Sequence, residues 1–236
     1  MSIRNLDALF APASVAVFGA SERPASVGAT VWRNLSEAFQ GRLYPVNPKH
    51  ARLGNVVAYD SVAALPEAPD LAVICTPAAT IPRLITQLGE RGTRAAVVVT
   101  AGLDKATKQA MLDAARPHTL RILGPNCIGM LVPHLGLNAS FAHIGAMPGE
   151  LAFVSQSGAL VTAMLDWAAA RGIGFSHFVS LGEHADVDFG DMLDFLGSDA
   201  KTRAILLYIE SVEAPRKFMS AARAAARNKP VIVIKS

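Results

Sequence analysis

The sequence predicts an α/β protein built on parallel sheets. Short runs of β-branched residues alternate with amphipathic segments along the whole chain, and the 236 residues are 51% hydrophobic but only 17% charged. This composition is typical of strands that helices cover on both faces of a sheet. We expect one domain in residues 1–130, a linker or crossover in residues 131–148, and a second, smaller α/β domain in residues 149–236.

The first domain shows strand and helix signals in regular succession. Residues 26–39 are expected to form a helix, with Ser26 as N-cap and apolar side chains every four residues. The other helices are expected at 79–91 and 105–116. Strands are expected at "SVAVFGA", "RLYPVNP", "DLAVICTP", "RAAVVVTAGL" and "LRILGPN". This β-α-β alternation favours a parallel sheet with helices on both faces.

Residues 128–148 interrupt the alternation with Gly, Pro, His and Asn, which predicts a loop. Beyond it, strands are expected at "ELAFVSQSG", "FSHFVSLG", "AILLYIES" and "PVIVIKS", and helices at 159–171, 189–197 and 215–227. The sequence stops at the carboxyl end of a predicted buried strand, where open α/β sheets place their ligand loops. We therefore expect the second domain to be truncated at its C-terminal end, within a longer protein.

Composition also narrows the function. A net charge of +3 without a basic run argues against nucleic acid as a partner and weakly favours small anions. The apolar stretches are broken by Pro, Gly or charge, so neither a signal peptide nor a membrane span is expected. Two cysteines indicate a reducing, cytoplasmic setting rather than a disulfide scaffold, and no metal site is expected.

The stretch "VFGASERPASVG" resembles only half of a dinucleotide-binding turn. Gly19 stands where the first glycine of the fingerprint belongs, but Ser21 and Pro24 replace the second and third. A strand, a turn and a helix start can present N–H groups to a phosphate. A tight turn without any ligand is the alternative.

The end of the second predicted strand lacks the acidic residue that binds the ribose of NAD. Asn47 and Lys49 stand there instead, and a lysine favours a phosphorylated ribose, as in NADP or coenzyme A. A solvated surface lysine is the alternative. Small or polar residues at three further strand ends would line the same crevice: Thr76, Pro77, Ala101, Gly102 and Asn126. Cys127 lacks a neighbouring base, so we expect a buried thiol rather than a nucleophile.

A second strand–turn–helix begins at "FVSQSGAL". Ser155, Gln156, Ser157 and Gly158 would sit at a helix N-terminus, which attracts anions. The G-x-S-x-G elbow of serine hydrolases does not match either serine. A purely capping role for Ser155 or Ser157 is the alternative.

Together, the motifs "GASERPASVG", "YPVNPKH", "TPAAT", "TAGL", "LGPNCIGML", "VSQSGAL", "DVDFGDMLDFL", "YIESVEAPRKF" and "KPVIVIKS" carry a family resemblance. The chain resembles, over nearly its whole length, the NDP-forming (ADP-forming) acyl-CoA synthetases of the succinyl-CoA synthetase superfamily. It is also similar to the synthetase-like part of protein lysine acetyltransferase fusions. The resemblance implies a Rossmann-like CoA-binding domain followed by a flavodoxin-like domain of the succinyl-CoA ligase type.

The resemblance implies the activity of an acid–thiol ligase. Acyl-CoA, NDP and phosphate would interconvert with acid, CoA and NTP through an acyl phosphate and a phosphohistidine. The implied partners are CoA, a small carboxylic acid or acyl phosphate, and an ATP-grasp domain or subunit that carries Mg and ATP or ADP. A homo-oligomer is also compatible with the resemblance.

The resemblance also assigns roles to single residues. Glu210 matches the glutamate that orients the phosphohistidine, with a solvated acid as the alternative. Phosphate would contact Ser155, Gln156, Ser157 and Gly158. CoA would contact Gly19, Ala20, Ser21, Ser26, Gly28, Asn47, Lys49, Thr76, Pro77, Ala78, Ala101, Gly102, Asn126 and Cys127.

Two departures from the family pattern leave other functions open. The family's histidine follows the strand that matches "KPVIVIK", and this sequence ends at Ser236, so none of its six histidines is assigned that role. Glu183 replaces the usual Asn and puts a negative charge near the phosphate site, unless its side chain points away. The alternatives are a regulatory module that senses CoA or acyl-CoA and, third, an NADP-dependent oxidoreductase. We expect the chain to bind CoA without ligase activity of its own.

Overall fold

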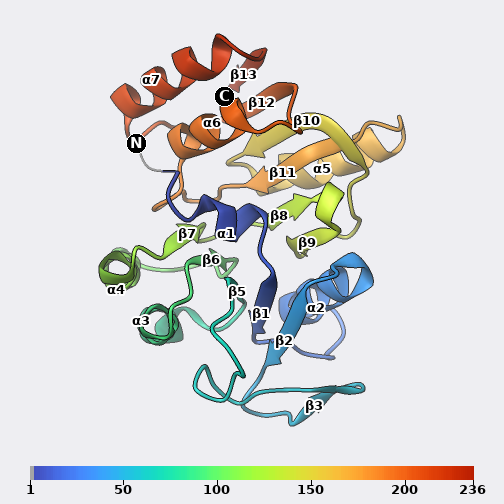
Figure 1. The fold of residues 1–236 in the computed structure, drawn as a ribbon, viewed down its shortest axis with the longest axis vertical. Coiled ribbons are helices and arrows are strands. Elements are labelled where there is room, and N and C mark those ends of the chain that lie inside the picture. Colours follow the sequence, from blue (N-terminus) through green and yellow to red (C-terminus); the bar gives the residue numbers. More distant parts are fainter. Residues whose placement is uncertain (1–2) are drawn as a thin grey trace.

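Two sheets with helices on both faces lie one above the other in the structure, a computed structural model that describes residues 3–236 (Figure 1). All strands of the first sheet are parallel, and the chain starts in its middle and builds outward to both sides. The direction of building reverses between β1 and β5, and ligands of open α/β sheets bind at such a point. In spatial order the strands are β2 (Arg42–Val46), β1 (Ser14–Phe18), β5 (Leu71–Ile74), β6 (Ala95–Val98) and β7 (Arg121–Leu123).

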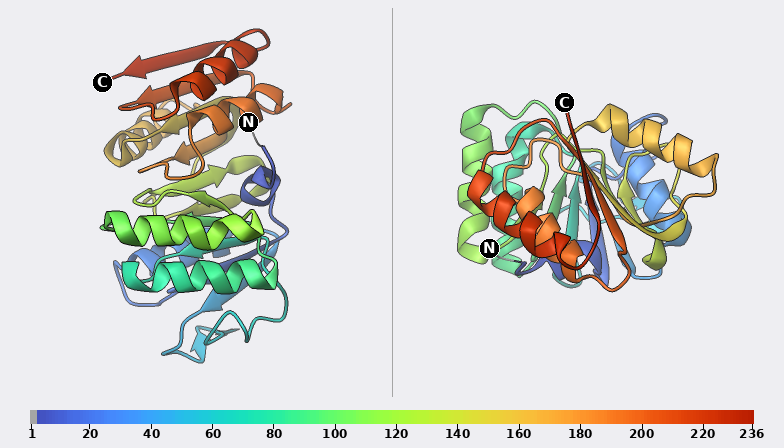
Figure 2. Two further views of the ribbon diagram at one scale, coloured as in Figure 1. Left: turned by 90° about the vertical axis from the view of Figure 1, so that its left-hand side faces the viewer. Right: turned by 90° about the horizontal axis from the view of Figure 1, so that it is seen from above.

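The helices of the first sheet divide between its two faces. Helices α3 (Ile81–Arg91) and α4 (Lys105–Ala115) lie side by side on one face (Figure 2). Helix α2 (Val27–Ala38) and the short α1 (Leu6–Phe10), which the sequence did not predict, pack on the other. As predicted, Ser26 is the N-cap of α2, because its hydroxyl accepts the N–H of Ala29.

The second sheet combines four parallel strands with an antiparallel hairpin. Helix α5 (Gly158–Ala169) covers one face, and α6 (Phe189–Ser198) and α7 (Pro215–Ala226) cover the other. In spatial order the strands are β13 (Val231–Lys235), β12 (Ala204–Ile209), β10 (Pro148–Ser155), β11 (Phe175–Ser180), β8 (Gly129–Val132) and β9 (Leu137–Ser140). A separate two-stranded ribbon, β3 (Arg52–Leu53) and β4 (Val56–Val57), follows β2.

The expected linker of residues 131–148 differs from the structure. Most of it belongs to the β8–β9 hairpin, which pairs with β11 at the edge of the second sheet. Gly129 has a φ of +109°, and a methyl group there would lie 2.2 Å from the carbonyl oxygen of Ala139, so only glycine fits this close strand contact. The Gly and Pro residues therefore mark a hairpin, and its pairing partner lies too far along the chain for local patterns to reveal.

A continuous hydrophobic core joins the two sheets. One cluster of buried side chains runs from β1 and β5 through α1 and α2 to β10, β11, β12, α6 and α7. The strands of the first sheet are fully buried along β1, β5 and β6, as their β-branched composition predicts. None of the helices in residues 3–236 has both the length and the apolar character needed to cross a membrane.

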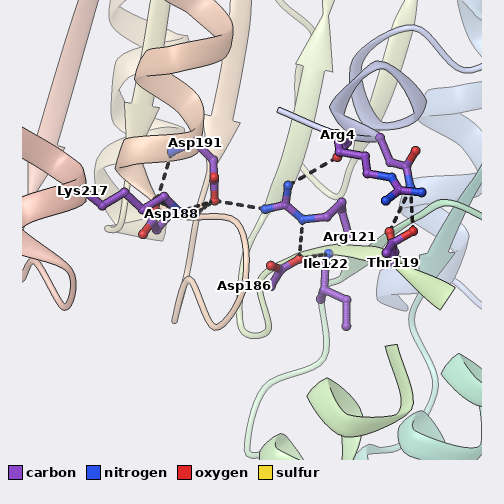
Figure 3. Close-up of polar contacts among 9 residues, drawn as sticks. Arg4, Thr119, Arg121, Ile122, Asp186, Asp188, Asp191 and Lys217 are labelled. Atoms are coloured by element: carbon purple, nitrogen blue, oxygen red, sulfur yellow. Dashed lines mark hydrogen bonds and ion pairs between the residues drawn. The ribbon is translucent and has the colours of Figure 1, made fainter. Parts of the chain in front are cut away.

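An ion-pair network centred on Arg121 also links the two sheets (Figure 3). Nε of Arg121, on β7, lies 2.9 Å from the Asp186 carboxylate, and Nη2 lies 3.0 Å from Asp191, which is 2% exposed. Asp191 also lies 2.7 Å from Nζ of Lys217 on α7. Each buried charge thus has opposite charges beside it, which burial of an ion requires.

Candidate functional site

A cavity of about 800 Å³ lies where the carboxyl ends of strands from both sheets meet. We call it the inter-sheet cavity. Loops that follow β5, β6, β7, β10, β11 and β12 all contribute to its wall, which is where α/β folds place ligands. Its lining comprises Val27, Cys75, Thr76, Pro77, Val99, Thr100, Ala101, Asn126, Cys127, Ile128, Phe141, Gln156, Ser157, Gly158, Gly182, Glu183 and Glu210.

Nine of the nineteen residues to which the sequence analysis assigned a site role line this cavity. They are Thr76, Pro77, Ala101, Asn126, Cys127, Gln156, Ser157, Gly158 and Glu210. Asn47 and Lys49 line a separate hollow of about 360 Å³ instead. The cavity lining does not include Gly19, Ala20, Ser21, Ser26, Gly28, Ala78, Gly102 or Ser155.

The first turn brings a helix start unusually close to a strand end. Gly19 has a φ of +85°, and a methyl group on Gly28 would lie only 1.9 Å from the Gly19 carbonyl oxygen. Gly28 therefore permits the close helix–strand packing that the third glycine of the dinucleotide fingerprint normally allows. The hydroxyl of Ser21 accepts the N–H of Arg23 at 2.9 Å and stabilises the turn.

Asn47 ties this turn to the end of β2. Its Nδ2 donates to the carbonyl oxygen of Ala20 at 2.8 Å, and its Oδ1 accepts the N–H of Lys49 at 2.9 Å. Both polar groups of the Asn47 side chain thus form hydrogen bonds with the backbone. The exposed Lys49 lines the separate hollow together with Asp60, so a positive and a negative side chain both lie at this edge.

The second turn places the start of helix α5 in the cavity wall. Ser157 caps the helix, because its hydroxyl accepts the N–H of Leu160, and the hydroxyl of Ser155 accepts the N–H of Ser157 at 3.0 Å. The capping role that the sequence left open is therefore present. The first N–H groups of a helix have no intrahelical acceptor and carry partial positive charge, which suits an anion.

Gln156 organises the loop that carries Glu210. Its Oε1 accepts the backbone N–H groups of Glu210 at 2.7 Å and Ser211 at 3.0 Å. Its Nε2 therefore faces the buried His184 ring, with 2.7 Å between Nε2 of Gln156 and Nε2 of His184. An amide nitrogen only donates, so Nε2 of His184 is the acceptor of this hydrogen bond. Sequence reasoning left His184 unassigned.

Glu183 contributes a compensated negative charge to the cavity wall. Its carboxylate lies 3.0 Å from Nζ of Lys108 on α4 and 3.5 Å from Nδ2 of Asn126. The sequence predicted the charge of Glu183 but not its partner, which lies 75 residues away. Glu210 is exposed, and no ion pair of its carboxylate is found within residues 3–236.

The two cysteines of the cavity are protonated thiols. Burial raises the pKa of Cys127 to about 12, and its Sγ donates to the carbonyl oxygen of Val98 at 3.4 Å. Burial, together with repulsion from Cys127, raises the pKa of Cys75 to about 12 as well. Since the thiolate is the nucleophile, neither side chain can act as one near neutral pH, as expected for Cys127.

The fold and the cavity define a class of protein, a doubly wound α/β protein with a cavity at the carboxyl ends of the strands of its two sheets. Residues 13–133 match the family described as CoA binding domain, and residues 148–236 match the succinyl-CoA ligase like flavodoxin domain. The chain belongs to this CoA-binding family and carries the ligase-like domain after it.

The most similar relatives include ADP-forming ligases. The chain is 40% identical to acetate–CoA ligase [ADP-forming] I of Archaeoglobus fulgidus, over 98% of the chain and 34% of that protein. It is 39% identical to the alpha subunit of acetate–CoA ligase [ADP-forming] I of Pyrococcus furiosus, over 98% of the chain and 53% of the subunit. The chain thus spans about a third to a half of these relatives.

A solved structure has the same fold. The dinucleotide forming acetyl-coenzyme A synthetase 1 of Ca. Korarchaeum cryptofilum, in complex with phosphate and ADP, superimposes with a TM-score of 0.93 and 37% identity. The match covers 98% of this chain and 51% of that one.

Proposed function

We propose that the chain is the CoA-binding portion of an NDP-forming acid–CoA ligase, an acid–thiol ligase. The observation that carries the proposal is the inter-sheet cavity. It brings the Asn126–Cys127 turn of the CoA-binding domain to the N-terminus of α5 and to Glu210. The thiol of CoA and an acyl phosphate at the N-terminus of α5 would thus meet within one space, as attack of the sulfur on the acyl carbon with departure of phosphate requires.

Each group of residues has a proposed role in this reaction. The phosphates of CoA would lie along residues 19–28, its ribose phosphate beside Lys49, and its pantetheine arm along Thr76–Ala78 and Ala101–Gly102 toward Asn126 and Cys127. Phosphate would lie at residues 155–158. Glu210 would orient the ring of a phosphohistidine through one nitrogen, because a carboxylate accepts the N–H of imidazole.

The charges of the cavity favour a monocarboxylic acid or its acyl phosphate. Among residues 3–236, the cavity lining includes two carboxylates, Glu183 and Glu210, but no Lys or Arg. A second carboxylate on the acid would therefore lack a cationic partner. The remaining partner we propose is an ATP-grasp domain or subunit that carries Mg and ATP or ADP, in a cytoplasmic setting.

A regulatory module that senses CoA or acyl-CoA is the second candidate. It is favoured by Glu183, whose carboxylate lies in the cavity wall, where a negative charge would oppose the binding of free phosphate. Ligase turnover in the presence of the proposed ATP-grasp part separates the two candidates, because a sensing module shows none. In a ligase, Glu183→Asn should leave turnover within about twofold, because Lys108 already offsets the charge of Glu183.

Parallel titrations with CoA, dephospho-CoA and NADPH test CoA binding by this chain. CoA should raise the midpoint of thermal unfolding, because a ligand that binds only the native state stabilises it. Dephospho-CoA should bind about tenfold more weakly, and Lys49→Ala should remove that difference, while Lys201→Ala, another exposed lysine, should retain it. Protection by NADPH but not by CoA would eliminate the proposal in favour of an oxidoreductase. Acyl-CoA synthesis by these 236 residues alone would also contradict it.

A further inference from the structure

Ile128 lies between the two turns that the proposed reaction brings together. It directly follows Asn126 and Cys127 in the chain and lines the inter-sheet cavity. A methyl group on Gly158 would lie 3.4 Å from both Cγ1 and Cδ1 of Ile128, so the side chain lies against the first residue of α5. In the proposed reaction, an acyl group between the thiol of CoA and the N-terminus of α5 would lie beside this side chain.

The backbone of Ile128 is held on both sides. Its N–H donates to Oγ of Ser180 at 3.0 Å, and its carbonyl oxygen accepts the N–H of Phe141 at 3.1 Å. Ser180 is 1% exposed at the end of β11, and Phe141 follows β9. Because two sheet-anchored residues hold the backbone, the side chain cannot move aside with a loop.

The surface around Ile128 is apolar. Val27, Val99 and Phe141 line the same cavity, and Ile128 also packs against the core cluster beneath α5. A hydrocarbon chain is stabilised when such a surface removes its CH₂ groups from water, but only where space is left for them. The volume of the Ile128 side chain therefore decides how much of an acyl chain fits.

We infer that Ile128 is a specificity-determining residue that limits the length and branching of the acyl group next to the sulfur of CoA. The inference rests on the proposed function, because that function places the sulfur at the Asn126–Cys127 turn. Gly158 is its neighbour at the start of α5, since a methyl group there would add volume beside the side chain that truncation of Ile128 would shorten.

Titration of the chain with CoA, acetyl-CoA, butyryl-CoA and isovaleryl-CoA tests the inference. Each acyl-CoA is scored by the ratio of its Kd to the Kd of CoA for the same variant. Ile128→Ala should lower the ratio for isovaleryl-CoA at least about tenfold and leave the acetyl-CoA ratio unchanged. Gly158→Ala should raise the isovaleryl-CoA ratio. The double variant, with Ile128→Ala and Gly158→Ala, should return this ratio toward the wild-type value, because the methyl group at position 158 fills space that the shortened side chain at position 128 leaves.

The matched control is Ile173→Ala, which truncates an isoleucine that packs on the same core cluster but is absent from the cavity lining. It should leave all ratios unchanged. If Ile128→Ala does not fold, Ile128→Val and Gly158→Ala give the same test in smaller steps. Equal changes of all ratios in the Ile128 variants, or the same shift in Ile173→Ala, would overturn the inference. Failure of the wild-type chain to bind CoA at all would instead contradict the proposed function.

Discussion

Acidification should destabilise the protein through His177, a buried histidine on β11. Its side chain is 5% exposed and packs nearly perpendicular to the rings of Phe10 and Phe195, which stack on each other, with ring centroids 5.4 and 5.5 Å from that of His177. Nδ1 has no hydrogen-bond partner within the described residues and lies 3.7 Å from the Asp199 carboxylate. Burial lowers the pKa of His177 from 6.5 to about 4, although the nearby carboxylate opposes this shift.

The lowered pKa sets the size and direction of the effect. Above pH 6.5 neither the native nor the unfolded state binds a proton at His177, so its protonation does not reduce the free energy of unfolding there. As the pH falls toward 4, the unfolded state takes up the proton and the native state does not. This difference lowers the free energy of unfolding by ~2 kcal/mol at pH 5 and by ~3 kcal/mol once the native state is also protonated.

Urea unfolding at pH 7.5 and pH 5.0 measures the effect. Between the two pH values, the free energy of unfolding of the wild-type chain should fall by ~2 kcal/mol more than that of His177→Leu, which has no titratable group at position 177. His50→Gln, a substitution of an exposed histidine, should behave like the wild type and serves as the control. Equal losses in the wild type and His177→Leu would show that His177 is not held neutral, and would refute the reasoning.

Three further predictions concern packing, the ion-pair network and the thiols. Gly28→Ala should destabilise the chain by about 1–3 kcal/mol and weaken CoA binding, because its methyl group would lie 1.9 Å from a backbone carbonyl oxygen. Thermal unfolding and a CoA titration measure the two effects, and an unchanged midpoint of thermal unfolding would contradict the close packing. Arg121→Met should lower the free energy of unfolding by about 3 kcal/mol in a urea titration, because it leaves the buried Asp191 with one cation fewer. A decrease below ~1 kcal/mol would show that the ion pair contributes no more than a solvated surface salt bridge. Iodoacetamide at pH 8 should modify Cys75 and Cys127 only after unfolding, because their pKa values of about 12 leave almost no thiolate in the native chain. Mass spectrometry measures the labelling, and rapid labelling of the native chain would contradict the prediction.

Local signals in the sequence determined most of the regular elements. The helix expected at residues 26–39 is Val27–Ala38, and the strand expected in "DLAVICTP" is Leu71–Ile74. Such elements can be predicted because an N-cap hydrogen bond and an apolar period involve residues within one or two turns of each other. The β8–β9 hairpin was missed, because its pairing with β11 joins segments about 50 residues apart.

For the site, strand ends in the sequence already indicated which segments would face a ligand, since the carboxyl ends of parallel strands share one edge. Only the tertiary structure decided how those ends combine. It placed Lys108 beside Glu183, turned the amide of Gln156 toward His184, and set Ile128 against α5. These contacts depend on how two separately wound sheets pack against each other through a shared core. No local pattern encodes that packing, because it is determined by the summed burial of side chains from the whole chain.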